Sequence, residues 1–128
     1  MQPSKEIMSP IPDPRPEMFV EERPWGGFEQ LTLNEQTTVK ILTIVPGARL
    51  SLQTHTHRAE FWRVLDGPLE VTIGDETVIA EPGDSFWIPL GALHRVGNTS
   101  DNIGRILEIA YGSFDESDIQ RLHDDYAR

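Results

Sequence analysis

The chain has 128 residues, which is enough for one compact domain with a core but too few for two. Its 21 acidic residues outnumber its 11 basic residues, giving a formal net charge of −10, and such a surface repels phosphate backbones and anionic lipid. The absence of cysteine excludes disulfides, thiolate metal sites and thiol nucleophiles. We therefore expect no nucleic-acid or membrane partner and, without a signal-like N-terminus, a cytoplasmic protein.

Proline dominates the N-terminal segment, where it removes backbone donors and fixes φ. Five prolines within the first 17 residues exclude both a helix and a central strand. We predict a Pro-rich arm over residues 1–20, laid along the domain or a partner subunit, and a single domain over residues 21–128. A turn anchored by Trp25 leads into that domain.

Short runs of β-branched and aromatic residues follow, separated by glycine and proline, and this pattern predicts strands. The run over 50–55 alternates, which places Gln53 and His55 on one face of a strand. Gly74-Asp75 between two apolar runs indicates a hairpin. The predicted strands cover residues 28–33, 39–45, 50–55, 61–65, 69–73, 77–80, 85–88, 94–98 and 106–111.

The last fifteen residues instead favour a helix. Ser113 and Glu116 have the spacing of a capping box, and Ile119, Leu122 and Tyr126 fall on one helical face. The many short strands before them predict a sandwich or barrel. A double-sheet jelly roll limits exposed strand edges and leaves a cavity between its sheets. We therefore expect an all-β jelly roll with a short C-terminal helix.

Two glycine-bounded segments, 47–67 and 83–98, hold three of the four histidines. Two imidazoles, a carboxylate and an amide oxygen suit one divalent ion such as Zn, Mn, Fe or Co. The predicted metal ligands are Gln53, His55, Glu60 and His94.

His57 fits two interpretations. If the strand stays extended, its side chain points the same way as that of His55 and replaces Gln53 as a ligand. If the chain turns after His55, His57 lies at the mouth of the cavity, where a group titrating near neutral pH can carry a proton.

The two segments read Gly47-x5-Gln53-x-His55-x4-Glu60-x6-Gly67 and Gly83-x5-Pro89-x-Gly91-x2-His94-x3-Asn98, which resemble the two cupin motifs with glutamine for the usual first histidine. Arg23-Pro24-Trp25-Gly26 and Gly112-Ser113-x4-Asp118-Ile119-x-Arg121 extend the resemblance to the C-terminal cupin domain of type II mannose-6-phosphate isomerases. This resemblance implies a jelly-roll barrel, a divalent metal, and interconversion of mannose 6-phosphate and fructose 6-phosphate. The chain departs from the pattern at Phe61 and Ala110, where polar residues are usual.

In an isomerase of this kind the metal polarises the carbonyl and stabilises the enediolate. The reaction also needs a base near the metal to move the proton, and a cationic group to bind the phosphate. His57 is the first candidate for proton transfer and Lys40 the second. Arg49, on the Gln53 face, and Arg58, at the corner before Glu60, are the expected phosphate ligands.

Two alternatives stay open at this point. One is a sugar- or metabolite-binding cupin without turnover, acting as a sensor or as the partner of a separate nucleotidyltransferase. The other is a different metal-dependent cupin enzyme, such as a dioxygenase using His55, Glu60 and His94 with iron. In each case we expect a homodimer, because jelly-roll cupins often pair through a sheet edge or face.

Overall fold

The structure, a computed structural model, describes residues 13–126. They divide into two compact units, one ending at Gln36 and the other beginning at Thr37. Most of the predicted Pro-rich arm, residues 1–12, lies outside the described residues. The arm and its boundary at residue 20 therefore stay predictions.

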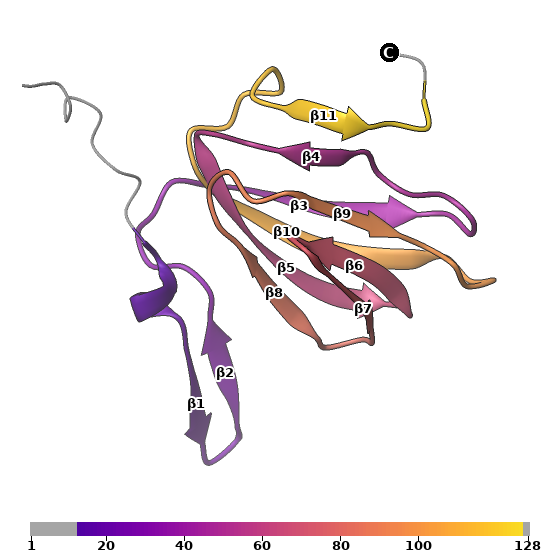
Figure 1. The fold of residues 1–128 in the computed structure, drawn as a ribbon. Coiled ribbons are helices and arrows are strands. Elements are labelled where there is room, and N and C mark those ends of the chain that lie inside the picture. Colours follow the sequence, from indigo (N-terminus) through magenta and orange to yellow (C-terminus); the bar gives the residue numbers. More distant parts are fainter. Residues whose placement is uncertain (1–12, 127–128) are drawn as a thin grey trace, which may run out of the picture. The chain divides into compact units, whose positions relative to one another are not determined.

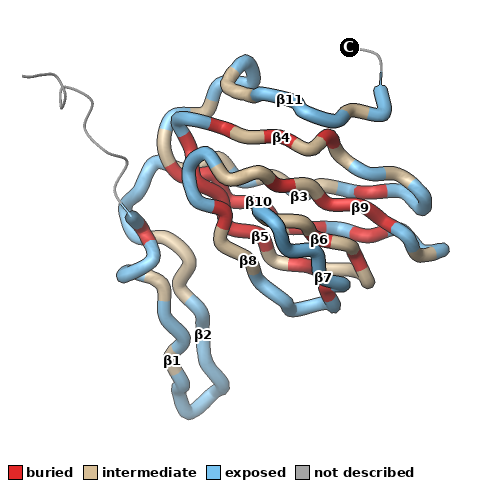
Figure 2. Tube along the Cα trace, in the orientation of Figure 1, coloured by how far each residue is buried: buried red, intermediate tan, exposed pale blue. Residues whose placement is uncertain are grey.

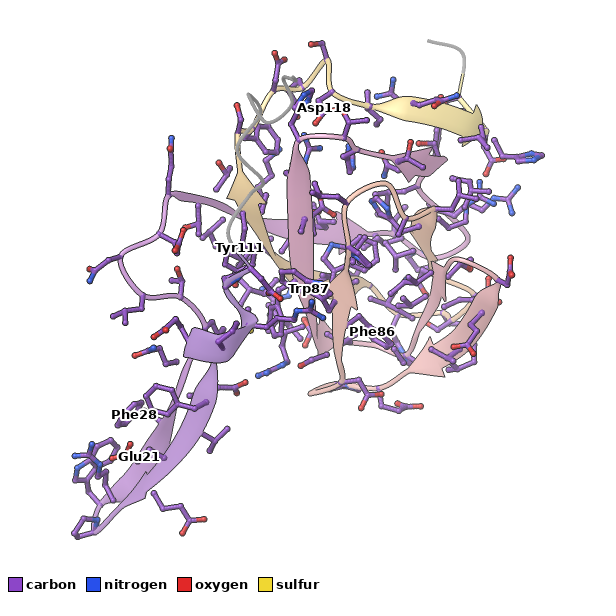
Figure 3. All side chains as sticks on the ribbon, turned by 60° about the vertical axis from the view of Figure 1, so that its left-hand side comes forward. Glu21, Phe28, Phe86, Trp87, Tyr111 and Asp118 are labelled. Carbon is purple, nitrogen blue, oxygen red and sulfur yellow. The ribbon has the colours of Figure 1, made fainter. Side chains whose placement is uncertain are left out.

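The first unit is built on a hairpin. A 3-10 turn, η2 (Arg15–Glu17), precedes the antiparallel strands β1 (Phe19–Arg23) and β2 (Gly26–Gln30). Glu21 lies opposite Phe28 across the pair (Figure 3), and the Phe19 and Phe28 rings meet edge to face with centroids 5.9 Å apart. Trp25 sits in the connecting turn, as predicted.

The second unit contains two antiparallel sheets that face each other (Figure 1). One sheet has the order β3-β10-β5-β8 and the other β11-β4-β9-β6-β7. Consecutive strands often lie in different sheets, which is the connectivity of a jelly roll. The strands are β3 (Thr37–Ile44), β4 (Leu52–Thr54), β5 (Arg58–Asp66), β6 (Leu69–Ile73), β7 (Glu76–Ala80), β8 (Ser85–Ile88), β9 (His94–Gly97), β10 (Gly104–Gly112) and β11 (Gln120–His123).

The core lies between the sheets, where alternating side chains of both inner faces meet. Buried positions concentrate along β5, β9 and β10 (Figure 2). Trp62 and Val64 of β5 pack there with Ile106 of β10 and Val96 of β9. Apart from this core cluster, Trp87 of β8 and Tyr111 of β10 form an aromatic pair, with ring centroids 5.6 Å apart (Figure 3).

The pairing of the strands gathers the candidate ligands from both sheets. In the five-stranded sheet Gln53 of β4 lies directly opposite His94 of β9. Glu60 belongs to β5 of the other sheet and points inward, with a residue exposure of 1%. The predicted all-β jelly roll is confirmed, and it sets these side chains around one interior point.

The predicted C-terminal helix is wrong. In the part of the chain that the structure describes, residues 120–123 form strand β11, which pairs with β4 through Gln120–Thr54 and Arg121–Gln53. Hydrogen bonds of Asp115 and Asp118 fix the preceding segment as turns. Pairing with a distant strand thus outweighs the local helical pattern. Among residues 13–126 no helix has the length and apolarity that crossing a membrane requires.

Candidate metal centre

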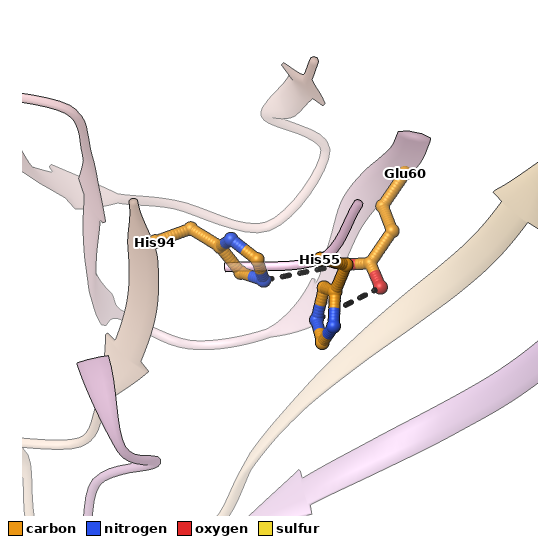
Figure 4. A group of neighbouring side chains, drawn as sticks. All are labelled: His55, Glu60 and His94. Carbon is orange, nitrogen blue, oxygen red and sulfur yellow. Dashed lines mark ion pairs between the residues drawn. The ribbon is translucent and has the colours of Figure 1, made fainter. Parts of the chain in front are cut away.

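Three of the four predicted metal ligands converge inside the jelly roll (Figure 4). One nitrogen of each of His55 and His94 and a Glu60 oxygen all lie within 4.8 Å of one another. His55 Nε2 is 3.6 Å from Glu60 Oε2, and His94 Nε2 is 3.5 Å from Glu60 Oε1. Their side chains are only 4%, 1% and 2% exposed, in the order His55, His94, Glu60.

Backbone carbonyls set the orientation of both imidazoles. His55 Nδ1 lies 2.7 Å from the Asp118 carbonyl oxygen, and His94 Nδ1 lies 3.0 Å from that of Ala92. Because a carbonyl oxygen only accepts, each Nδ1 carries the proton, and each Nε2 keeps its lone pair. Among the described residues the lone pair of His94 Nε2 then faces Glu60 alone, whereas that of His55 Nε2 faces both Glu60 and the Arg58 guanidinium.

The polar atoms at this point fit a metal ion. Glu60 Oε1 and His94 Nε2 are buried and have no hydrogen-bond partner among the described residues. Leaving such atoms unpaired costs about 1–3 kcal/mol each. Two ligands held about 2.1 Å from a tetrahedral ion stand about 3.4 Å apart, and each histidine Nε2 lies 3.5 or 3.6 Å from one of the two Glu60 oxygens. A divalent ion would therefore satisfy both atoms.

Burial keeps the two imidazoles neutral. It lowers the pKa of His94 to about 4 and also lowers the pKa of His55. Neutral histidine is the form that binds metals. The nearby Glu108 behaves in the opposite way, because burial, and after it the charge of Glu60, raise the pKa of Glu108 to about 7.

A pocket of about 200 Å³ opens beside these ligands and is lined by seven further polar or charged side chains. It brings together the predicted residues Lys40, Gln53 and Arg58 with His55 and Glu60. The seven side chains are Lys40, Ser51, Gln53, Arg58, Glu108, Glu116 and Arg121.

Arg58 lies closest to the ligands. Its Nε donates to Glu60 Oε2 at 3.1 Å, and its Nη2 lies 3.3 Å from His55 Nε2. Its guanidinium also stacks over the Phe114 ring, with 4.2 Å from Cζ to the ring centroid. Lys40 Nζ lies 4.1 Å from the same centroid and pairs with Glu116 at 3.4 Å. One aromatic ring thus holds both cations at the pocket.

Among the predicted site residues outside the metal-ligand set, two do not line this pocket. Arg49 forms a bidentate pair with Asp125, at 2.7 and 3.0 Å, and lines a separate hollow. It precedes β4, which begins only at Leu52, so the alternation assumed from residue 50 does not apply to it. The side chain of His57 is 57% exposed and lies 3.5 Å from Asp118, because the chain turns after His55.

Sequence reasoning did not assign a role to three residues that the structure places at the site. Glu108 accepts a hydrogen bond from Trp62 Nε1 at 3.1 Å, and Arg121 lines the pocket opposite Gln53. Alternation along β10 would have placed Glu108 inward, with Ile106 and Ala110. Asp118 accepts from the Thr56–His57 turn, and these hydrogen bonds outweigh its burial to lower the pKa of Asp118 to about 2.

The two-sheet jelly roll with a buried His/Glu/His group is the architecture of a cupin. Solved structures agree with this fold. Capsular polysaccharide assembling protein CapF from Staphylococcus aureus has a TM-score of 0.62 and 18% identity, over 83% of this chain and 34% of that one. An oxalate oxidase in complex with glycolate has a TM-score of 0.60 and 18% identity, over 67% and 46%. At such low identity these likenesses show the fold alone.

The model of the family described as mannose-6-phosphate isomerase C-terminal matches residues 17–124. The chain belongs to this family. Xanthan biosynthesis protein XanB of Xanthomonas campestris is 43% identical over 107 residues, and alginate biosynthesis protein AlgA of Pseudomonas aeruginosa 42%. Mannose-1-phosphate guanylyltransferase ManC of Salmonella typhimurium is 39% identical. Each match covers 83% of this chain but only 22–23% of the relative, so the chain spans less than a quarter of their length.

These names contradict the prediction that the chain interconverts mannose 6-phosphate and fructose 6-phosphate. The relatives are named for guanylyl transfer to mannose 1-phosphate and for polysaccharide biosynthesis. The isomerase prediction is therefore wrong as the function of this chain. What the comparisons support is a cupin domain from an enzyme family of mannose metabolism.

Proposed function

We propose that this chain is a metal-binding cupin domain that binds a mannose phosphate and works alongside mannose-1-phosphate guanylyl transfer. The observation that carries the proposal is the position of the His55–Glu60–His94 group beside a pocket that is also lined by cationic side chains. The ligand set is His55, Glu60 and His94, with Gln53 as the fourth member, around one divalent ion. When bound, such an ion supplies a Lewis acid for sugar oxygens.

The size of the pocket supports a small ligand. At about 200 Å³ it falls below the range of about 300–1,000 Å³ that is usual for sites of drug-sized ligands. A monosaccharide phosphate suits this volume better than a nucleotide sugar does. Glu108 and Gln53 offer acceptors and an amide for sugar hydroxyls, which is the chemistry that a polyol requires.

The charges support a phosphate on that ligand. The formal net charge of the chain is −10, yet Lys40, Arg58 and Arg121 all line this pocket. These three cations offset the carboxylates of Glu60, Glu108 and Glu116 in the same pocket, and a bound divalent ion would make the site attractive to a small anion. Arg58 and Lys40 replace Arg49 in the role of phosphate ligand, since Arg49 is paired with Asp125 outside the pocket.

Calorimetric titration tests the proposal on protein stripped with chelator and on protein reloaded with Zn²⁺ or Mn²⁺. We expect mannose 1-phosphate to bind the metal-loaded protein more tightly than mannose or inorganic phosphate, and to bind the stripped protein weakly. Mannose 6-phosphate serves to locate the phosphate-binding end of the pocket. No binding of either mannose phosphate to the loaded protein would overturn the proposal.

Variants of the pocket cations provide a second arm. We expect Lys40→Met to weaken mannose 1-phosphate binding about tenfold, the size of one charge-assisted hydrogen bond. Arg105→Met is the matched control, because Arg105 pairs with Asp66 away from the pocket. Equal loss in both variants would show that net charge, and not the pocket, decides binding. The homodimer and the cytoplasmic location stay predictions.

A further inference from the structure

The segment 113–119, which we call the C-terminal strap, leads from β10 to β11 and is bonded to the turn that carries His55. Its hydrogen bonds to this turn fall on four consecutive residues, 55 to 58. At the far end of this run, Arg58 Nη1 donates to the Asp115 carbonyl at 3.1 Å. The other three residues are all held by Asp118.

Asp118 uses both its side chain and its backbone in these contacts. Its Oδ1 accepts from Thr56 N at 3.0 Å and from Thr56 Oγ1 at 2.8 Å. Its Oδ2 accepts from His57 N at 2.9 Å. Its carbonyl oxygen accepts from His55 Nδ1 at 2.7 Å. Figure 3 shows Asp118 at the strap, next to this turn.

The two sets of contacts are mechanically linked, because one residue makes them. The carboxylate anchors the strap to the Thr56–His57 turn, and the anchored carbonyl selects the His55 tautomer with its proton on Nδ1. That tautomer directs the Nε2 lone pair toward Glu60. Without the anchor the carbonyl is free to move, and so is the ring.

We propose that Asp118 is a positioning residue of the metal centre, which holds His55 in its metal-binding orientation through the strap. The proposal rests on the proposed function only in that it takes His55 as a ligand. A strap drawn from the C-terminal segment is then required to complete a site whose ligands all lie earlier in the chain.

Three variants separate this role from simple support of the fold. Asp118→Ala removes all three side-chain bonds, whereas Asp118→Asn keeps an acceptor for Thr56 and loses the one for His57 N. Asp115→Asn is the matched control on the same strap, since among residues 13–126 its carboxylate accepts only from Ser117 N and Oγ, at 2.9 and 2.8 Å.

The first measurement is made on metal-free protein, by ¹⁵N NMR of the imidazole nitrogens. Wild type and Asp115→Asn should show His55 as a single tautomer protonated at Nδ1, and Asp118→Ala should show exchange between tautomers. The second is Zn²⁺ affinity, measured by competition with a chromogenic chelator. Asp118→Ala should bind about 10- to 100-fold more weakly, Asp118→Asn should lie between, and Asp115→Asn should stay within about twofold.

An unchanged His55 tautomer and unchanged Zn²⁺ affinity in Asp118→Ala would overturn the proposal. So would an equal loss in Asp115→Asn. If Asp118→Ala fails to fold, the graded effect of Asp118→Asn decides between the outcomes. If wild type binds no metal at all, the proposed function fails, but the tautomer comparison on metal-free protein still tests Asp118 by itself.

Discussion

His94 Nε2 lies 3.5 Å from Glu60 Oε1, and neither of these buried atoms has a hydrogen-bond partner within residues 13–126. The two residues come from opposite sheets of the jelly roll, so only the folded chain brings them together. Burial lowers the pKa of His94 to about 4, which leaves a neutral nitrogen facing a carboxylate oxygen. The contact between these two atoms stabilises the buried pair little, whereas a metal ion bound by both atoms would stabilise it strongly.

The positive charge of Arg58 should weaken binding of the metal ion. Its guanidinium bonds Glu60 Oε2 and lies 3.3 Å from His55 Nε2, so its charge stands beside the candidate ion. We expect Arg58→Gln to strengthen Zn²⁺ binding about tenfold, which is about 1.4 kcal/mol and modest for two nearby like charges. The same variant should weaken mannose 1-phosphate binding.

Competition titration with a chelator measures the first effect and calorimetry the second, with Arg105→Gln as the control. Weaker Zn²⁺ binding in Arg58→Gln would show that Arg58 acts mainly by ordering Glu60, contrary to this prediction.

Glu108 should make the metal-free protein less stable as the pH rises. Its pKa is raised from 4.5 to about 7, first by burial and then by Glu60. Between those values the folded state binds more protons than the unfolded chain, so the free energy of unfolding falls as the pH increases through this window. The full effect is about 3 kcal/mol.

Glu108→Gln should remove this pH-dependent loss of stability, because an amide does not ionise and its oxygen still accepts the hydrogen bond from Trp62 Nε1. We expect the variant to gain about 1–3 kcal/mol over wild type on going from pH 4 to pH 8. Urea unfolding in the presence of chelator measures the difference, and comparing the two proteins at each pH cancels the opposite contributions of His55 and His94. A difference that does not change with pH would refute the assignment.

Gly104 should be needed for the packing of Leu69. A Cβ at Gly104 would lie 2.4 Å from Leu69 Cδ2 and 2.8 Å from its Cγ, and Leu69 is 1% exposed in the core. We expect Gly104→Ala to destabilise the protein by about 1–3 kcal/mol. In a Leu69→Ala background the same change should cost little, since the clashing atoms are gone. Additive costs, measured by urea unfolding, would contradict this explanation.

The sequence predicted most of the fold because its turn residues are local signals. The bounds predicted for β6 and β8 match the structure. A glycine with positive φ lies in the turn beside each strand, Gly74 directly after β6 and Gly83 two residues before β8. Strand β11 was not predictable in this way. Its sequence has helical spacing, and what makes it a strand is pairing with β4 and the contacts of Asp118, both distant along the chain.

The candidate site divides along the same line. Gln53, His55, Glu60 and His94 belong to two short segments of the sequence, so their spacing predicted a common point. Which arginine side chains face that point depends on where β4 begins and on how the C-terminal strap bonds to the turn before β5. The sequence therefore suggested Arg49 as readily as Arg58, and only the structure separates them.

The most direct test of the account is the number of metal ions held per chain. Equilibrium dialysis of chelator-stripped protein against Zn²⁺ or Mn²⁺, followed by elemental analysis, should give one ion per chain for wild type. His123→Ala, which changes an exposed histidine on β11, should also hold one ion. His94→Ala and Glu60→Gln, checked for folding by circular dichroism, should hold none at the same free metal concentration. Wild type without metal, or folded His94→Ala with a full complement, would contradict the account.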